Sequence, residues 1–165
     1  MFYKDALIAE LKYESGLTKK MLERVPLEKA SWQPHEKSMT LGRLATHVAE
    51  IPQWISRVIT IDDFDFLAYG FSRHTAESKE ELLKIFQEKL DKAIADLNTM
   101  QNEDFDKKWT LRRGEHIILE TPKKVAIRGW GYSHFIHHRG QLSLYLRLLN
   151  VPVPGMYGPS ADEKM

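Results

Sequence analysis

The strongest indication of the fold lies between Leu41 and Ile61, where the sequence reads LGRLATHVAEIPQWISRVITI. Apolar residues recur there at alternating intervals of three and four, at Leu41, Leu44, Val48, Ile51, Ile55 and Val58. This spacing places them on one face of a helix, and such a stripe is typical of a helix in a bundle. Pro52 lies inside the pattern, has no N–H and crowds the preceding turn, so we expect a kink there.

Three further segments show the same helical periodicity, over residues 2–25, over residues 79–100, and from 125 or 127 to 149. Pro26 ends the first of them, and Pro152 and Pro154 prevent the last from continuing. The segments between the helices, 26–39 and 62–77, are rich in turn-forming and charged residues and are expected to be loops.

The residues between the third and fourth helical segments do not show helical periodicity. Two short runs rich in β-forming residues, 109–111 and 116–119, flank a turn at Gly114, which predicts a β-hairpin. The tail from Asn150 to Met165 contains three prolines and two glycines, so it should be extended and packed against the body. We therefore predict an all-α fold, a four-helix bundle with one small β-hairpin, in a single domain over residues 1–165.

Composition excludes several classes of protein. The chain has 165 residues, 42% hydrophobic and 28% charged, with a net charge of +1, which is the balance of a globular protein. Without cysteine it has no disulfide, thiolate metal site or cysteine nucleophile, so any metal ligands must be His, Asp or Glu. No apolar run approaches the ~20 residues of a membrane span, and no signal-peptide pattern is present. We expect a cytoplasmic protein.

Charge is unevenly distributed along the chain. Acidic residues dominate 60–106, and basic residues dominate 107–128. The basic side chains of the second segment are Lys107, Lys108, Arg112, Arg113, Lys123 and Lys124. Two solvated faces of a neutral protein are the favoured interpretation. The alternative is recognition of a small anion, whose carboxylates the guanidinium groups of Arg112, Arg113 and Arg139 could bind. For Arg139, pairing with an acidic residue of a neighbouring helix is the favoured role. Near-zero net charge argues against a nucleic-acid partner.

Three of the seven histidines can converge. His134 and His138 are four residues apart on the last helix and fall on its inward stripe, while His47 lies beside the apolar stripe of the second helix. Three neutral imidazoles with one open position are the usual ligand set of a catalytic divalent metal. Histidines four apart are also common as surface or capping residues, so spacing alone leaves both interpretations open.

Several neighbouring residues are candidates for supporting roles. Glu50 and Gln141 are polar residues near the three histidines and could orient ligands or carry protons. The aromatic residues Trp54, Trp130 and Tyr145 are candidate walls of a substrate pocket, although aromatics at helical spacing are more often core residues. The remaining histidines are expected to be structural or at the surface, and these are His35, His74, His116 and His137.

The stretch Ser133–Leu142, SHFIHHRGQL, contains the pattern H-x-x-x-H-R-G-Q and resembles the diagnostic motif of the DinB/YfiT-like superfamily. Residues 41–50 are similar to the first ligand motif of that superfamily, and residues 154–163 are similar to its common ending. The resemblance covers nearly the whole chain. One departure is His137, which stands where an aromatic residue such as Tyr is frequent.

The resemblance implies a bundle with up-down-down-up connectivity and a long crossover. It implies a divalent metal ion, commonly nickel, zinc or iron, with His47, His134 and His138 as its ligands. It also implies a homodimer and, in members with known reactions, a low-molecular-weight thiol that the metal converts to a thiolate, as in bacillithiol transferases. The family name carries no implication of DNA binding.

Two functions from different classes follow. The first is a metal-dependent enzyme acting on a small-molecule substrate, such as a thiol-dependent S-transferase or a hydrolase, with no catalytic side chain yet assigned. The second is a non-catalytic metal-binding protein of a stress response or of an interaction complex, in which the metal closes the bundle. Independently, we expect a homodimer, because a lone bundle would leave Trp32, Trp54, Phe64 and Phe66 partly uncovered.

Overall fold

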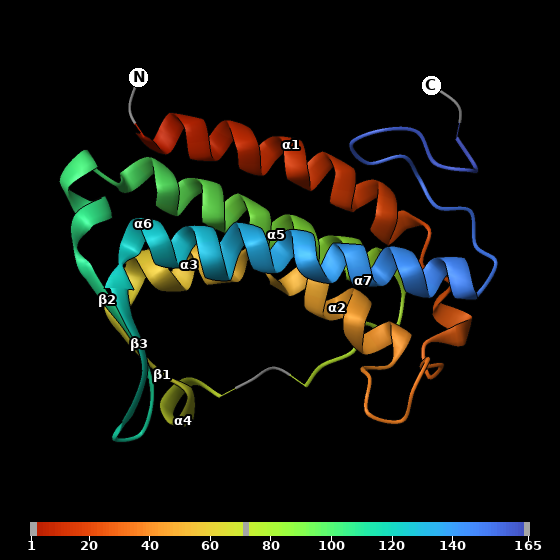
Figure 1. Ribbon diagram of the computed structural model, residues 1–165, viewed down its shortest axis with the longest axis horizontal. Helices are drawn as coiled ribbons and strands as arrows, with labels where there is room; N and C mark the ends of the chain where they lie inside the picture. Colours follow the sequence, from red (N-terminus) through yellow and green to blue (C-terminus); the bar gives the residue numbers. More distant parts are fainter. Residues whose placement is uncertain (1–2, 71–72, 164–165) are drawn as a thin grey trace.

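The computed structural model describes residues 3–70 and 73–163 and is mostly helical, with one small sheet (Figure 1). Its α-helices are α1 (Tyr3–Glu23), α2 (Leu41–Glu50), α3 (Gln53–Thr60), α4 (Phe66–Tyr69), α5 (Lys79–Thr99), α6 (Lys123–Ala126) and α7 (His134–Leu148). Short 3-10 turns, η1 (Leu27–Lys29) and η2 (Asn102–Asp106), and a π-helical segment, η3 (Ile127–Ser133), complete the helical part. None of the described helices combines the length and apolarity that crossing a membrane requires.

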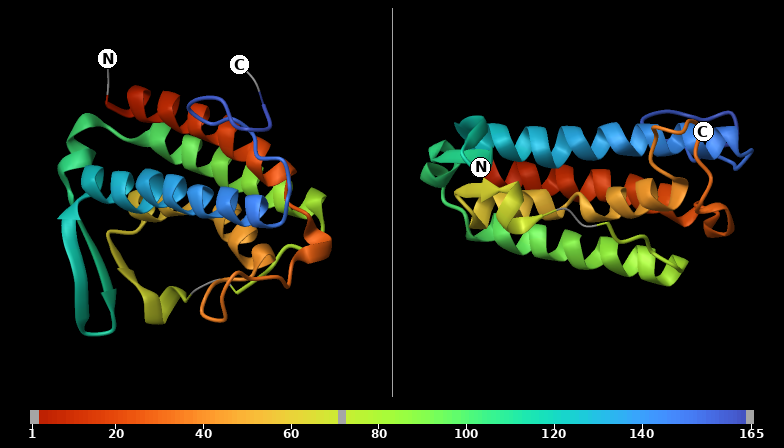
Figure 2. Two further views of the ribbon diagram at one scale, coloured as in Figure 1. Left: turned by 45° about the vertical axis from the view of Figure 1, so that its right-hand side comes forward. Right: turned by 90° about the horizontal axis from the view of Figure 1, so that it is seen from below.

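The long helices pack side by side in a ring. α1 contacts α5 and α7, and the kinked pair α2–α3 also contacts α5 and the helix formed by η3 and α7. Figures 1 and 2 show α1 and α6–η3–α7 running in one direction, with α2–α3 and α5 running in the opposite one. This is the expected up-down-down-up arrangement, and the connection between α3 and α5 crosses the length of the bundle (Figure 1).

The kink at Pro52 divides the second predicted helix in two. α2 ends at Glu50 and α3 begins at Gln53, with the N–H of Trp54 bonded to the carbonyl of Ile51 at 2.9 Å. Thr40 begins α2 by accepting a hydrogen bond from the N–H of Arg43 at 3.3 Å. The last predicted helix starts earlier than expected, at Lys123, and contains η3. The count of four helices is therefore not confirmed, because two predicted helices are divided and α4 is additional.

The predicted hairpin is confirmed as β2 (Lys108–Arg113) and β3 (His116–Pro122), with Gly114 in its turn at a φ of 58°. The prediction that 62–77 is only loop is wrong. Residues Asp63–Asp65 form β1, which pairs in parallel with β2, and α4 follows. Three residues are too few to show strand periodicity, and parallel pairing depends on a partner far along the chain.

Most of the aromatic residues that motivated the expectation of a homodimer are covered within the chain. Trp54 and Phe64 are buried, and Trp32 and Phe66 are partly buried against the core. The ring of Phe64 lies against Trp54, Phe66 and Tyr69. Their hydrophobicity therefore no longer argues for a second copy, and the homodimer remains a prediction.

A buried ion pair joins the first and last long helices of the bundle. Arg139 of α7 pairs with Glu14 of α1 at 2.6 Å, with side-chain exposures of 3% and 8%, and also donates to the hydroxyl of Thr18. The Tyr157 hydroxyl donates to the Glu14 carboxylate, which ties the extended tail to both helices. Arg139, one residue beyond His138, therefore has a structural role.

Replacing Arg139 with Ala should lower the free energy of unfolding by about 3–5 kcal/mol, because Glu14 would remain buried without its partner. The matched control is Arg147→Ala, which removes the more exposed pair with Asp162 and should cost much less, because solvent screens that pair. Urea denaturation followed by circular dichroism measures both. Equal losses in the two variants would contradict the role assigned to the Arg139–Glu14 pair.

Candidate metal centre

The structure brings His47, His134 and His138 together. One ring nitrogen from each lies within 4.8 Å of the others, and all three residues are half-buried. The Nε2 atoms of His47 and His134 are 3.2 Å apart, and the ring of His138 lies 4.6 Å from that of His47 between centroids. His47 comes from α2 and the other two from the first turns of α7, so the packing of these helices creates the cluster.

The π-helical segment η3 ends at the first histidine of α7. The N–H of His134 bonds to the carbonyl of Gly129, five residues back, and the carbonyl of Trp130 lies 3.3 Å from Nδ1 of the same histidine. Gly131 allows α3 to approach, since a Cβ there would lie 2.6 Å from Cγ1 of Ile55. Sequence periodicity did not predict this segment. π-turns inside helices are frequent at functional sites.

Two carbonyl oxygens hold the imidazoles in one tautomer. Nδ1 of His134 faces the Trp130 carbonyl, and Nδ1 of His138 lies 2.7 Å from Oε1 of Gln141. Because these oxygens only accept hydrogen bonds, both Nδ1 atoms carry the proton, and each Nε2 of a neutral ring is left with a lone pair. The amide nitrogen of Gln141 lies 3.0 Å from Nε2 of His137, which places its oxygen toward His138.

Sequence reasoning identified Gln141 as a candidate supporting residue, and the structure places it in contact with His138. His137 lies outside the group of three but contacts its edge through Gln141.

The environment keeps the three rings uncharged. Burial, followed by repulsion from the charged forms of His138 and His134, lowers the pKa of His47 to about 3. Burial also lowers the pKa of His134 to about 4, with His138 adding to the effect, and lowers the pKa of His138. Neutral imidazole is the form that binds a metal ion, so near neutral pH all three rings are in the protonation state that a metal ligand requires.

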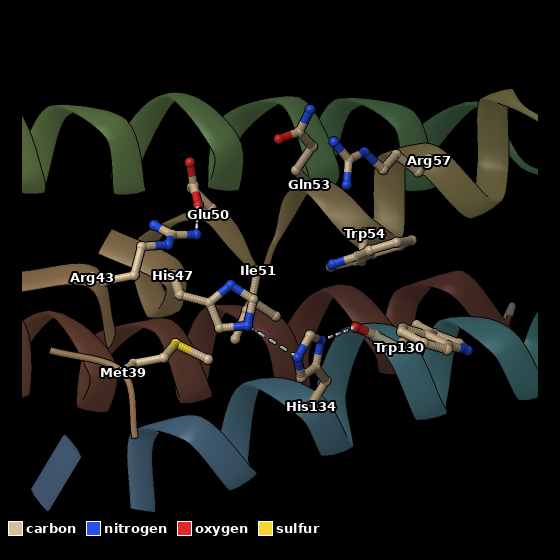
Figure 3. A pocket seen from close by; sticks show the side chains of 10 residues that line it. All are labelled: Met39, Arg43, His47, Glu50, Ile51, Gln53, Trp54, Arg57, Trp130 and His134. Carbon is tan, nitrogen blue, oxygen red and sulfur yellow. Dashed lines mark hydrogen bonds and ion pairs between the residues drawn. The ribbon is translucent and has the colours of Figure 1, made fainter. Parts of the chain in front are cut away.

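A pocket of about 350 Å³ opens beside His47 and His134 (Figure 3). Trp54 and Trp130 line it, with ring centroids 5.0 Å apart, so both are wall residues as predicted. Tyr145 is not among its lining residues and instead packs edge-on against Trp32.

The polar part of the pocket is charged. Glu50 lines it, and its carboxylate pairs with Arg43 at 2.7 Å. Gln53 and Arg57 face the pocket from α3. Sequence reasoning named Glu50 as a supporting residue but did not single out the two arginines, because nothing local to Arg43 or Arg57 distinguishes them from surface residues.

The other histidines serve the structure elsewhere. Nε2 of His74 lies 2.8 Å from a carboxylate oxygen of Glu81, a partner that the sequence did not indicate. Nδ1 of His35 accepts a hydrogen bond from the N–H of Lys37. His116 is exposed at the start of β3.

Five of the six basic side chains named for this segment pair with carboxylates of the same chain, and the sixth, Arg113, is exposed. Arg112 pairs with Asp63 at 2.7 Å and with Asp65 at 2.8 Å, which holds β1 to β2. The lysines behave likewise, in the pairs Lys107–Asp104, Lys108–Glu120, Lys123–Asp62 and Lys124–Asp106. The suggestion that Arg112 is a fork for a small anion is therefore wrong, since local carboxylates already occupy it.

The fold and the cluster define a helical protein with a candidate three-histidine metal centre. Comparison with known proteins gives its family: the chain belongs to the DinB family, whose model matches residues 1–164. It is 23% identical over 159 residues to the uncharacterized protein YrdA of Bacillus subtilis (strain 168), covering 96% of this chain and 90% of YrdA.

Two solved structures share the fold. A DinB-like protein from Bacillus cereus superposes with a TM-score of 0.70 at 21% identity, covering 93% of this chain and 97% of its own. The DinB-like protein YjoA of Bacillus subtilis gives a TM-score of 0.68 at 18% identity, covering 88% and 92% respectively. These likenesses support the arrangement of the helices.

The metal-free protein should lose stability as the pH falls below 6.5. In the unfolded chain the three histidines take up protons near their usual pKa of 6.5, whereas the folded rings of His47 and His134 stay neutral down to about pH 3 and 4. The unfolded state therefore binds more protons, and the free energy of unfolding decreases with falling pH. Urea denaturation between pH 7 and about 5, above the range of the carboxylates, measures it.

In the variant His47→Gln this slope should be shallower by up to about 1.4 kcal/mol per pH unit, because one proton fewer is taken up on unfolding. The variant His116→Gln, at an exposed position, should keep the wild-type slope. A wild-type slope in the His47 variant would show that this ring is not held neutral by the fold.

Proposed function

We propose that the chain is a metal-dependent enzyme in which His47, His134 and His138 hold a divalent ion. The observation that carries this is the convergence of three half-buried ring nitrogens, two of them on the wall of a pocket. A structural histidine cluster would have no need of such a pocket. Three protein ligands and access to a cavity are the arrangement that leaves a coordination position for substrate.

The donor set fits nickel, zinc or iron. All three donors are neutral imidazole nitrogens, which suit these ions. The hydrogen bonds that Nδ1 of His134 and Nδ1 of His138 donate to the Trp130 carbonyl and to Gln141 fix two of the rings in orientation. A divalent ion bound there would act as a Lewis acid and lower the pKa of a water or thiol beside it.

The chain's own residues would prepare the reaction. The Trp130 carbonyl and Gln141 hold the imidazoles in orientation, and Trp54 and Trp130 exclude water from one side of the pocket. Glu50, which also lines the pocket and pairs with Arg43, is the carboxylate placed to accept or return a proton. A thiol-dependent S-transferase, with a low-molecular-weight thiol as cosubstrate, is the specific reaction proposed, on the strength of the H-x-x-x-H-R-G-Q motif.

The second candidate is a non-catalytic metal-binding protein. His137 favours it, because this ring lies 4.9 Å from that of His138 between centroids and could supply a fourth ligand after a side-chain rotation. A sealed site with four protein ligands would be structural. The pocket beside His47 and His134 supports the enzyme instead.

We also propose that the protein acts in the cytoplasm as a homodimer. Its composition supports the location, and exposed apolar side chains on α7, Leu144 and Leu148, support the assembly. Light scattering should return twice the 19.2 kDa mass of one chain, and a mass of one chain at micromolar concentration would contradict it.

Metal content tests the proposed ligands. Protein purified without a nickel column should contain about one divalent ion per chain, and the double variant His134→Ala with His138→Ala should fall below about a tenth of that, since one imidazole cannot hold the ion alone. Elemental analysis by mass spectrometry measures both, and circular dichroism should show retained helix. Gln141→Leu should bind the metal about 10–100-fold more weakly, because His138 would lose its orienting partner.

The exposed His116→Ala variant is the control and should keep the full metal content. A double variant of α7 that still carries one ion per chain would show that the metal binds elsewhere.

A further inference from the structure

We infer that Arg57 is the anion-binding subsite of the pocket and that the substrate is a small molecule carrying one carboxylate. The carboxylate would pair with the guanidinium of Arg57 while the reacting group of the same molecule lies at the three histidines. This inference rests on the proposed function for the histidine end of the pocket, and the anion end is argued from the side chains of α3.

Arg57 is held in place by aromatic rings rather than by acids. Its guanidinium carbon lies 4.8 Å from the ring centroid of Trp54 and 5.1 Å from that of Phe64. Within residues 3–70 and 73–163, no carboxylate lies at ion-pair distance from it and no hydrogen bond from its guanidinium is formed. Stacking on two rings leaves the edge of the guanidinium, which carries its donors, available to a ligand.

The other arginine of the pocket is already occupied. Arg43 donates to the Glu50 carboxylate at 2.7 Å and to the carbonyl of His74 at 2.8 Å. Arg57 is half-buried, and burial lowers its pKa because the charged form loses hydration, an effect that the charge of Glu50 opposes. A cation that is partly removed from water is costly when, as among the described residues here, no carboxylate lies at ion-pair distance, so a ligand that brings one gains affinity there.

Charge and shape favour a single carboxylate. The pocket side chains Arg43, Glu50 and Arg57 together carry one net positive charge when the histidines are neutral. A guanidinium binds a carboxylate through two parallel hydrogen bonds, which matches charge and geometry at once. A phosphate, with nearly two negative charges, would be left only partly neutralised beside Glu50.

The side chains that line the pocket between its two ends indicate the chemistry of the central part of the ligand. Figure 3 shows Gln53 and Arg57 on one side of the pocket and His47 and His134 on the other, with Trp54 and Trp130 alongside. A molecule reaching from one side to the other would place an apolar segment against the two indoles. The volume of about 350 Å³ is at the lower end of small-molecule sites. The substrate class is therefore a short carboxylic acid with an apolar spacer and a metal-directed group at its far end.

The inference is tested with ω-mercaptocarboxylates of increasing chain length, compared with ω-mercaptoalcohols of the same lengths. Binding to the cobalt(II)-loaded protein is followed by the thiolate-to-cobalt charge-transfer absorbance, without any assay of activity. At the best-fitting length the carboxylate should bind at least ~10-fold tighter than the alcohol. In Arg57→Gln this preference should fall below ~2-fold while cobalt content is unchanged, because Arg57 lies outside the histidine cluster.

Two further variants sharpen the comparison. Arg57→Lys keeps the charge without the fork and should retain an intermediate preference, which also serves if the Gln variant does not fold. Arg113→Gln removes an exposed hairpin arginine and should keep the full preference. Equal binding of acid and alcohol to the wild type, or an undiminished preference in both Arg57 variants, would overturn the inference. Tighter binding of ω-mercaptoalkyl phosphates than of the carboxylates would overturn the choice of anion.

Failure of the metal centre can be told apart from failure of the subsite. If no cobalt binds, the charge-transfer band is missing from every variant, and the proposed function fails. Simple alkyl carboxylates and the matching alcohols are then titrated into metal-free protein, with quenching of tryptophan fluorescence as the signal, since Trp54 and Trp130 line the pocket. Carboxylate-selective quenching that is lost in Arg57→Gln supports the subsite, and unselective quenching contradicts it.

Discussion

Three imidazole rings on α2 and α7 share one half-buried space, and burial together with their mutual repulsion keeps them neutral. In two of these rings, those of His134 and His138, the Nδ1 proton lies on the side away from the shared space. The Trp130 carbonyl and the Gln141 side chain impose that condition from behind two of the rings. The same condition presents lone pairs to a common centre, which is why a cluster that is unfavourable to protons is favourable to a divalent ion.

The surrounding helices place this cluster at one end of a pocket whose other end carries Arg57. The break at Pro52 separates α2, which carries His47, from α3, which carries Trp54 and Arg57. The π-helical segment η3 brings Trp130 beside Trp54 and, through Gly131, lets α3 pack closely. An imidazole end and a guanidinium end thereby face one pocket. The buried Arg139–Glu14 pair, one residue beyond His138, fastens α7 to α1.

The parts of this account that follow from local pattern could be predicted from the sequence. Periodicity predicted the long helices and the kink, and the spacing of His134 and His138 predicted their shared face. Strand β1 was not predicted from the sequence, because its pairing with β2 joins residues more than forty positions apart. The role proposed for Arg57 could not be predicted for a related reason. Only the folded structure shows that Arg112 forms ion pairs with Asp63 and Asp65, whereas no carboxylate among the described residues pairs with Arg57.

The coordination of the metal is the central claim, and X-ray absorption spectroscopy of the zinc-loaded protein tests it most directly. The account predicts four nitrogen or oxygen scatterers at about 2.0–2.1 Å, with outer-shell scattering from three imidazoles and the remaining ligand from solvent. Scattering from four imidazoles would mean a site closed by a further histidine. An absence of imidazole scattering would mean that His47, His134 and His138 do not hold the metal.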